Sequence, residues 1–157
     1  MTVKLVQNYN MTDIANSINY LLDKASLDPG VRDFSLQIVS NSPDKISAIY
    51  DWIQYNVQYV SDPIDVELFT SPIRMVRDHQ DGKSLAGDCD DMAILATALY
   101  RSVGIESNVM LLDTTGKGID HAISRAKSDK LGWVNSDPSD KTHPLGWEIK
   151  SFSKVTV

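Results

Sequence analysis

The chain has 157 residues, of which 42% are hydrophobic and 23% are charged, as expected of one globular domain long enough to bury a core. Its net charge of −6 and its pI near 4.9 argue against nucleic-acid binding, which needs a basic surface. One cysteine cannot form an internal disulfide. The sequence shows no signal peptide and no run of the ~18 apolar residues that span a membrane. We therefore expect a cytoplasmic protein that does not bind a membrane.

The first third of the chain has the apolar spacing of helices. Three helices are predicted in succession, and each follows a start signal. Thr12 is the expected N-cap of the first, Asp28-Pro29 begins the second, and Ser42-Pro43 begins the third. From residue 61 to residue 84 the periodicity disappears and turn signals take its place. This stretch is predicted to be a long connection that forms one wall of a cleft.

A single segment holds the only cysteine and begins a strongly periodic apolar helix. The sequence Gly87-Asp88-Cys89-Asp90-Asp91 precedes apolar positions at helical spacing, and a glycine at 104 ends the pattern. A helix N-terminus favours an anion, so the thiol is placed where a thiolate forms most readily. The acidic neighbours oppose this, and a lone cysteine can equally be a small core residue. Cys89 is therefore a candidate nucleophile only if a base and a carboxylate accompany it.

After this helix the period of the apolar residues changes from helical spacing to two. Strands are expected over residues 107–113, 121–127 and 131–137, with a tight turn at 128–130. Helices followed by antiparallel strands indicate an α+β domain.

The last two strands allow a geometric prediction. If their turn is centred on Asp129, His121 lies opposite Asp137, with Cβ atoms ~4.5–5.5 Å apart. A carboxylate at that distance can hold an imidazole in one tautomer. A two-residue turn would instead place His121 opposite Pro138. His79 and His143 are expected on the surface, and no spacing of a zinc or EF-hand site predicts a metal.

Several motifs together resemble the transglutaminase-like superfamily. They are Gly87-Asp88-Cys89-Asp90-Asp91, His121-Ala122, residues 133–139, Ser71-Pro72 and the helix 49–53 that leads to Tyr59. With the tail 144–148, the form is similar to compact members from bacteria and tailed phages. The resemblance covers residues 43–148 and implies a papain-like core in which the nucleophile helix packs on an antiparallel sheet. Residues 1–42 would then be a helical N-terminal extension of a single domain, 1–157.

The resemblance also implies roles for individual residues. Cys89 would be the nucleophile, His121 the general base and then acid, and Asp137 the group that orients the imidazole. The Cys89 backbone N–H and Tyr59 would form an oxyanion hole. Residues expected at the substrate cleft are Ser71, Asp88 and Trp147. No cofactor and no metal are implied.

The expected function is cysteine-dependent acyl transfer on amide bonds of a peptide or protein, through a thioester. Hydrolysis by a protease, deamidase or amidase is favoured, because transfer to an amine requires that water be kept from the thioester. The alternative is a non-catalytic module with the same fold, such as a phage virion or assembly component or a modulator of a host protein. Fold alone does not choose between them.

Overall fold

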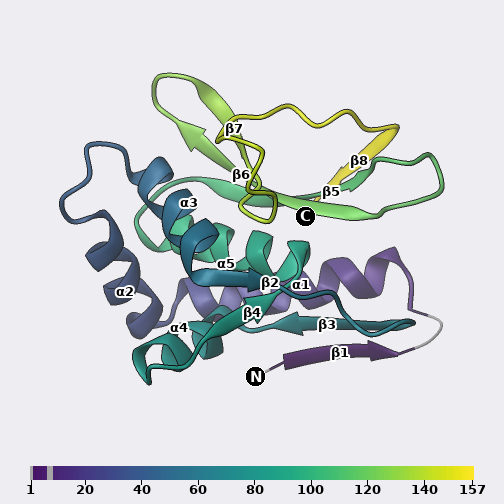
Figure 1. Cartoon of the computed structure of the whole chain (residues 1–157), viewed down its shortest axis with the longest axis horizontal. Helices are drawn as coiled ribbons and strands as arrows, with labels where there is room; N and C mark the ends of the chain where they lie inside the picture. The colour runs from purple at the N-terminus through teal and green to yellow at the C-terminus, as the bar shows by residue number, and fades with distance from the viewer. Residues whose placement is uncertain (1, 7–8) are drawn as a thin grey trace.

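The computed structural model describes residues 2–6 and 9–157 (Figure 1). The elements in chain order are β1 (Thr2–Val6), α1 (Met11–Ser26), α2 (Pro29–Val39), α3 (Lys45–Asn56), β2 (Val57–Tyr59), β3 (Val66–Thr70), α4 (Pro72–Gln80), β4 (Leu85–Gly87), α5 (Cys89–Ser102), β5 (Ser107–Asp113), β6 (His121–Ser128), β7 (Gly132–Ser136) and β8 (Ser153–Thr156).

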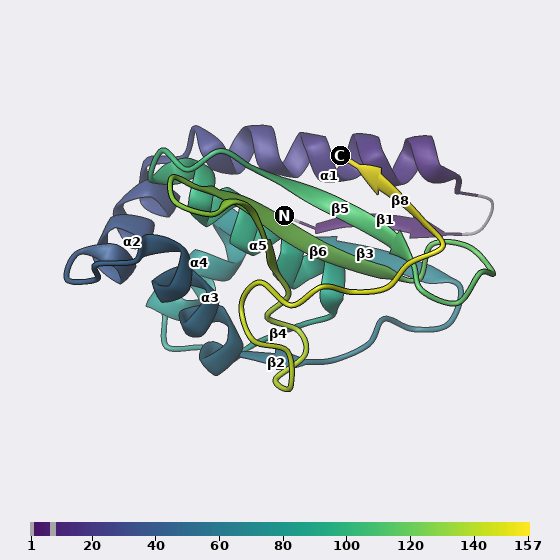
Figure 2. The same cartoon turned by 90° about the horizontal axis from the view of Figure 1, so that it is seen from above.

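Helix α5 forms the centre of the molecule. Its residues from 90 to 100 are all buried, so the helix has no solvent face along most of its length. An antiparallel four-stranded sheet of order β7-β6-β5-β8 covers one side, and α1, α2, α3 and α4 pack against the others (Figures 1 and 2). This arrangement confirms the predicted α+β class, with the cysteine-bearing helix packed on an antiparallel sheet.

The three N-terminal helices form where the apolar periodicity predicts them, but two of them begin at other caps. The second helix is capped by Asp28 as predicted. The first is capped by Asn10 rather than Thr12, and the third by Asp44 rather than Ser42. In each helix the capping oxygen accepts a hydrogen bond from the third backbone N–H, and this geometry selects the N-cap among neighbouring polar residues.

Residues 61–84 are more ordered than predicted, because they contain β3, α4 and a short connection. Strand β3 pairs antiparallel with β1, the first strand in the sequence. The expected helical character of residues 1–42 is therefore incomplete, since this segment starts with a strand. β3 buries only Phe69 fully, so it shows little alternation. A strand with one buried side chain and a distant partner has almost no local signal.

The predicted register of the hairpin formed by β6 and β7 is wrong. The turn is centred on Lys130, because Ser128 pairs with Gly132 and Arg125 pairs with Asn135. The prediction had centred the turn on Asp129. In the observed register the ladder ends before His121 is reached, and β7 ends at Ser136. The contact that His121 makes therefore does not arise from strand pairing.

Carboxylates fix the N-terminus of α5. Asp88 is the N-cap, and the Asp91 carboxylate accepts a hydrogen bond from the Asp88 backbone N–H at 3.3 Å, which completes a capping box. The other oxygen of Asp91 accepts a hydrogen bond from the Thr70 backbone N–H at 2.7 Å, so the same side chain joins β3 to α5. Gly87 makes room for it, because a Cβ there would lie 2.7 Å from the Cβ of Asp91.

This capping arrangement brings acidic groups together in a poorly solvated place. Burial raises the pKa of Asp91 to about 7, although the hydrogen bond from Thr70 acts in the opposite direction. Burial, followed by the charge of Asp88, also raises the pKa of Glu67 to about 7. Burial and a hydrogen bond with Asp88 raise the pKa of Asp90 to about 11. The folded chain therefore binds protons more tightly here than the unfolded chain does.

We expect the free energy of unfolding to fall as the pH rises from about 5 to about 7. A raised carboxyl pKa stabilises the fold while the folded state keeps the proton, and this contribution is lost as the pH rises through about 7 for Asp91 and Glu67. The slope is up to about 1.4 kcal/mol per pH unit for each proton concerned. Urea unfolding in EDTA-containing buffer measures it. Glu67→Gln should flatten the slope and Glu106→Gln, at an exposed position, should not; a stability that rises over this range would contradict the prediction.

Truncating a buried side chain of α5 should destabilise the whole domain. The Leu99 side chain is 0% exposed and packs in the core shared by the helices. Leu99→Ala is therefore expected to lower the free energy of unfolding by about 2–5 kcal/mol. The matched control is Leu131→Ala, because Leu131 is 79% exposed; it should change stability by less than about 0.5 kcal/mol. Equal midpoints of urea denaturation for the two variants would show that α5 is not the centre of the core.

Candidate active site

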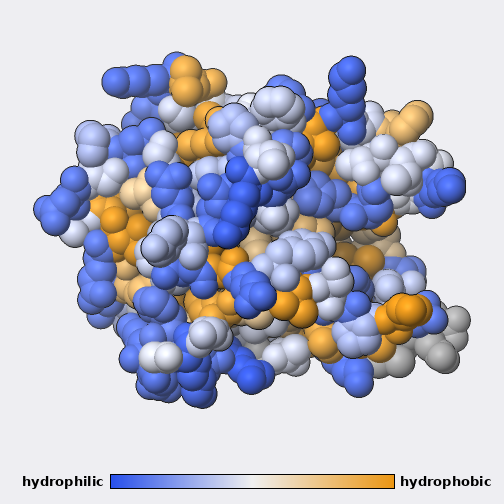
Figure 3. All heavy atoms as spheres, in the orientation of Figure 1, coloured by the Kyte–Doolittle hydropathy of each residue, from blue (hydrophilic) through white to orange (hydrophobic). Residues whose placement is uncertain are grey.

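Cys89 and His121 line one cleft of about 470 Å³. The cysteine is the first residue of α5, and the histidine is the first residue of β6, so the cleft lies where the central helix begins beside the sheet. The segment between β2 and β3 forms another part of its wall, with Tyr59 at its start. Figure 3 shows the face of the molecule seen in Figure 1 as a largely hydrophilic surface on which apolar side chains lie in groups.

The thiol of Cys89 is partly exposed and is held neutral by its surroundings. Burial, followed by the charge of Asp90, raises its pKa to about 12, while a hydrogen bond from the Ala122 backbone lowers it. The helix N-terminus was expected to favour the thiolate, but burial and the adjacent carboxylates outweigh that effect. A nucleophile at this position therefore needs a base that takes its proton.

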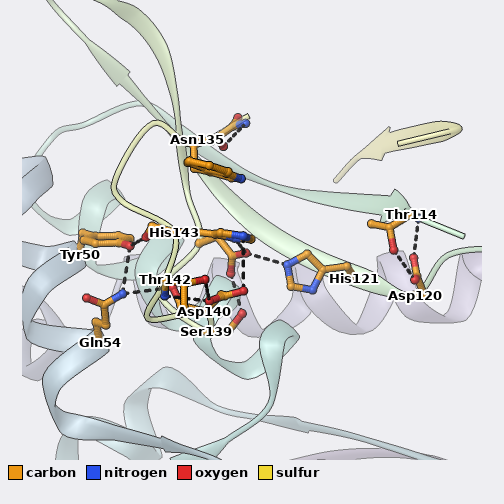
Figure 4. A network of polar contacts seen from close by, with 12 residues as sticks. Tyr50, Gln54, Thr114, Asp120, His121, Asn135, Ser139, Asp140, Thr142 and His143 are labelled. Atoms are coloured by element: carbon orange, nitrogen blue, oxygen red, sulfur yellow. Dashed lines mark hydrogen bonds and ion pairs between the residues drawn. The ribbon is translucent and has the colours of Figure 1, made fainter. Parts of the chain in front are cut away.

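His121 and Asp137 form a hydrogen-bonded pair (Figure 4). His121 Nε2 lies 2.8 Å from Asp137 Oδ2, and Asp137 is 4% exposed. The Ser139 hydroxyl donates to the other carboxylate oxygen at 2.6 Å. Burial alone would raise the pKa of Asp137, but the hydrogen bond and charge of His121 lower it overall. Burial lowers the pKa of His121, and its interactions with Asp137 reverse this, so it is raised overall.

The pairing through Nε2 determines what the imidazole can do. An ionised carboxylate is only an acceptor, so the proton of a neutral His121 lies on Nε2. Nδ1 is then an acceptor that can take a proton from a group in the cleft. The contact between His121 and Asp137 was predicted from sequence, but a different geometry produces it. Asp137 reaches the imidazole from the segment after β7, not from a paired position in the strand.

The other expected site residues are placed differently. Tyr59 and Asp88 line the cleft. Ser71 does not line it: it is 3% exposed and is the N-cap of α4. Trp147 is 48% exposed, and its ring stacks on His143 with a centroid distance of 5.1 Å. It therefore lies near the carboxylate of the pair rather than in the cleft itself.

His143 was expected on the surface, and its position beside Asp137 was missed. His143 Nδ1 lies 3.7 Å from Asp137 Oδ2 (Figure 4). The segment that carries it folds back onto α3, where the Tyr50 hydroxyl donates to the His143 backbone oxygen and Gln54 donates to the Asp140 backbone oxygen. Only the closeness of His143 to Asp137 in the chain hinted at this contact, because it depends on how the segment folds.

Two overlapping groups of carboxylates, within the part of the chain that the structure describes, could hold a cation. One is Asp62, Glu67 and Asp88, and the other is Asp88, Asp90 and Asp91; the ligand atoms of each group lie within 4.8 Å of one another. Asp91 already accepts hydrogen bonds from two backbone N–H groups. These carboxylates also account for the acidic character of the cleft wall.

Among the described residues, no helix combines the length and the apolar character needed to cross a membrane.

Comparison with solved structures finds the same fold in larger proteins. A candidate protease from Parabacteroides distasonis matches with a TM-score of 0.57 and 15% identity over 76% of this chain and 25% of its own. A candidate cysteine protease from Cytophaga hutchinsonii matches with a TM-score of 0.55 and 19% identity over 98% of this chain and 54% of its own. The chain thus spans a quarter of the first protein and about half of the second. No curated protein matches the chain.

A family model matches residues 32–138, more than half of the chain. This range contains the α5 cysteine, the β6 histidine and the aspartate that binds it. It begins within α2, so the family core also includes part of the segment expected to be an extension. The chain belongs to the transglutaminase-like superfamily.

Proposed function

We propose that this domain catalyses cysteine-dependent acyl transfer on amide bonds of a peptide or protein. The observation that supports this is one arrangement: Cys89 and His121 line the same cleft, and Asp137 holds His121 through Nε2. A binding module with this fold has no need of such an arrangement. The family and the candidate proteases that share the fold support an enzymatic function over that of a non-catalytic module.

The proposed first step uses a neutral thiol. His121 Nδ1 takes the proton of Cys89, and Sγ attacks the amide carbonyl carbon to form a tetrahedral oxyanion. Asp137 stabilises the imidazolium that results, which the lowered pKa of Asp137 and the raised pKa of His121 favour. The C–N bond then breaks, and the imidazolium gives its proton to the leaving amine or ammonia. A thioester on Cys89 remains.

In the second step water attacks the thioester. His121 accepts a proton from that water, the C–S bond of the tetrahedral intermediate breaks, and the His121 imidazolium returns its proton to Sγ, which restores the Cys89 thiol and releases a free carboxylic acid. An amine in place of water would give transamidation. We favour hydrolysis, because transamidation requires that water be excluded from the thioester and the cleft is open to solvent at Tyr59, which is 50% exposed.

Two donors are proposed for the oxyanion. The backbone N–H of Cys89 is at the first position of α5 and so has no partner within the helix. The hydroxyl of Tyr59 is the second, because Tyr59 lines the same cleft and is paired with Gly87 in the β2–β4 ladder. Gly87 is two residues before Cys89 in the chain, so this pairing brings Tyr59 near the proposed nucleophile.

The charge of the cleft suggests the kind of substrate. Its lining includes the carboxyl groups Asp62, Asp65, Glu67, Asp88, Asp90 and Asp120, and among the described residues no lysine or arginine lines it. Bringing a positive charge to these groups would offset their mutual repulsion and return the pKa of Glu67 toward its ordinary value. We therefore propose that the substrate carries a lysine or arginine close to the reacting amide.

The proposed domain is the whole chain, 1–157. Three contacts support this: α1 packs on α5, α2 packs on α5, and β1 pairs with β3 in a two-stranded sheet. The extension 1–42 then belongs to the same folding unit as the catalytic core.

The first experiment follows alkylation of Cys89 by iodoacetamide against pH, by intact mass. The pKa of His121 is raised above the ordinary histidine value of about 6.5. If neutral His121 is the base for the thiol, the alkylation rate should rise as the pH increases through that raised pKa. His121→Ala should slow alkylation at pH 8 by about 10²–10⁴-fold. Asp137→Asn should move the acid limb to lower pH, because the imidazole loses its anionic partner.

The control for this experiment is His79→Ala, since the His79 ring contacts Phe34 and Trp52 and not the cleft. It should alkylate at the wild-type rate. A wild-type rate that is independent of pH between about 5 and 9 would show that His121 does not act as the base for Cys89.

The second experiment compares peptides that differ only beside a glutamine, with lysine, norleucine or glutamate as the neighbour. We expect kcat/KM to be about tenfold or more higher for the lysine peptide than for the glutamate peptide, with the preference shrinking at 1 M salt. Mass spectrometry measures the hydrolysed or deamidated product and the thioester on Cys89. Asp62→Asn should reduce the preference, while Glu106→Gln, at an exposed position, should not. Equal rates for the three peptides would contradict the proposed substrate class.

A further inference from the structure

Asp137 has two imidazole neighbours, not one. His121 Nε2 lies 2.8 Å from Oδ2, and His143 Nδ1 lies 3.7 Å from the same oxygen. The two rings come from different elements, His121 from β6 and His143 from the segment after β7, and Figure 4 labels both. The nearer imidazole makes the hydrogen bond, so the farther one is a competing partner for the same oxygen.

The His143 ring is held where it is. On one face it stacks on Trp147 with an interplanar angle of 7°. Its backbone oxygen accepts a hydrogen bond from the Tyr50 hydroxyl, which anchors the segment to α3. The Trp147 end is fixed too, because the Asn135 side chain donates to the Trp147 backbone oxygen at 3.2 Å. This ring therefore occupies a defined position next to Asp137.

The surroundings of the ring suit a cation. Nδ1 is buried, has no hydrogen-bond partner, and faces Asp137, while Nε2 lies 3.4 Å from Asp140 Oδ2. A neutral imidazole has one N–H donor and one acceptor nitrogen, whereas ionised carboxylates can only accept hydrogen bonds. A protonated imidazole has two N–H groups and can offer one to each carboxylate. The other titratable groups facing it are His121 from β6, through the shared carboxylate, and Tyr50 from α3.

We propose that His143 is a positioning residue that shares the Asp137 carboxylate with His121, so that protonation of either imidazole weakens the hold of Asp137 on the other. Such coupling is reciprocal, because both rings draw on one negative charge. With His143 beside it, Asp137 stabilises the His121 imidazolium less than it would alone. His121 therefore remains a neutral base to lower pH than it would without His143.

The consequence for catalysis rests on the proposed function, but the coupling itself does not. If His121 is the base for Cys89, sharing Asp137 broadens the acid limb of the reaction. If Cys89 is not a nucleophile, the two imidazoles still share one carboxylate oxygen. A test on the imidazoles alone therefore separates the two ideas.

NMR titration of the histidine ring protons, with all three histidines assigned, is the test. In the wild type we expect His121 to titrate over a broad range in two steps. In His143→Phe, which keeps a ring to stack on Trp147, His121 should titrate in a single step with its midpoint at higher pH. The resonances of His79, which packs on Phe34 and Trp52, should not move and serve as an internal reference.

A second variant and a second readout guard against misfolding. His143→Asn should give the same single-step titration of His121. At about pH 6, where an increase of half a unit in the His121 pKa leaves about threefold less neutral imidazole, Cys89 alkylation should be about threefold slower in both variants. An His121 titration that is already single-step in the wild type and unchanged in both variants would overturn the inference, whatever the reactivity of Cys89.

Discussion

The burial of α5 is the constraint on which the other features of this molecule depend. A helix buried along eleven consecutive residues cannot shift without opening the core, so whatever stands at its first turn is held in place. The chain uses that first turn for its only cysteine. The capping box of Asp88 and Asp91 sets where the helix begins, and the hydrogen bond from Thr70 ties that beginning to β3. Rigidity at Cys89 is a property of the core.

This arrangement has an electrostatic cost. The carboxylates that cap the helix and line the cleft are brought together with little water, and the raised pKa values of Glu67, Asp90 and Asp91 express that cost. Burial, followed by the acidic groups beside it, keeps the Cys89 thiol protonated. A cleft of this kind repels anions, and a cysteine nucleophile in it would need a base. The imidazole of His121 lines the same cleft, and its partner Asp137 lies outside the cleft wall.

The segment after β7 supplies that partner. It leaves the sheet at Ser136, places Asp137 against His121, and then folds onto α3 through Tyr50 and Gln54. The fold of the sheet thus sets His121, while the fold of an irregular segment sets Asp137. The His121–Asp137 pair therefore forms only when both the sheet and the irregular segment adopt their folded positions. Within this segment the ring of His143 stacks on the ring of Trp147.

The sequence by itself determined α1, α2, α3 and α5, the strands β5, β6 and β7 of the main sheet, the start of α5 at the cysteine, and the family to which the chain belongs. Helix α4 and strand β8 were not predicted. These features depend on periodicity and on short motifs such as Gly87-Asp88-Cys89, whose physical reasons are local. Even the association of His121 with Asp137 was predictable, although the register used to predict it was two residues from the observed one.

Only the tertiary structure decided the features that depend on distant partners. The pairing of β1 with β3 has no local signal, because β3 buries one side chain and its partner is some sixty residues away along the chain. The protonation of Cys89 depends on how deeply the first turn of α5 is buried. Ser71 proved to be a buried cap, and His143 a neighbour of Asp137, because burial and the course of an irregular segment are set by the packing of the whole chain.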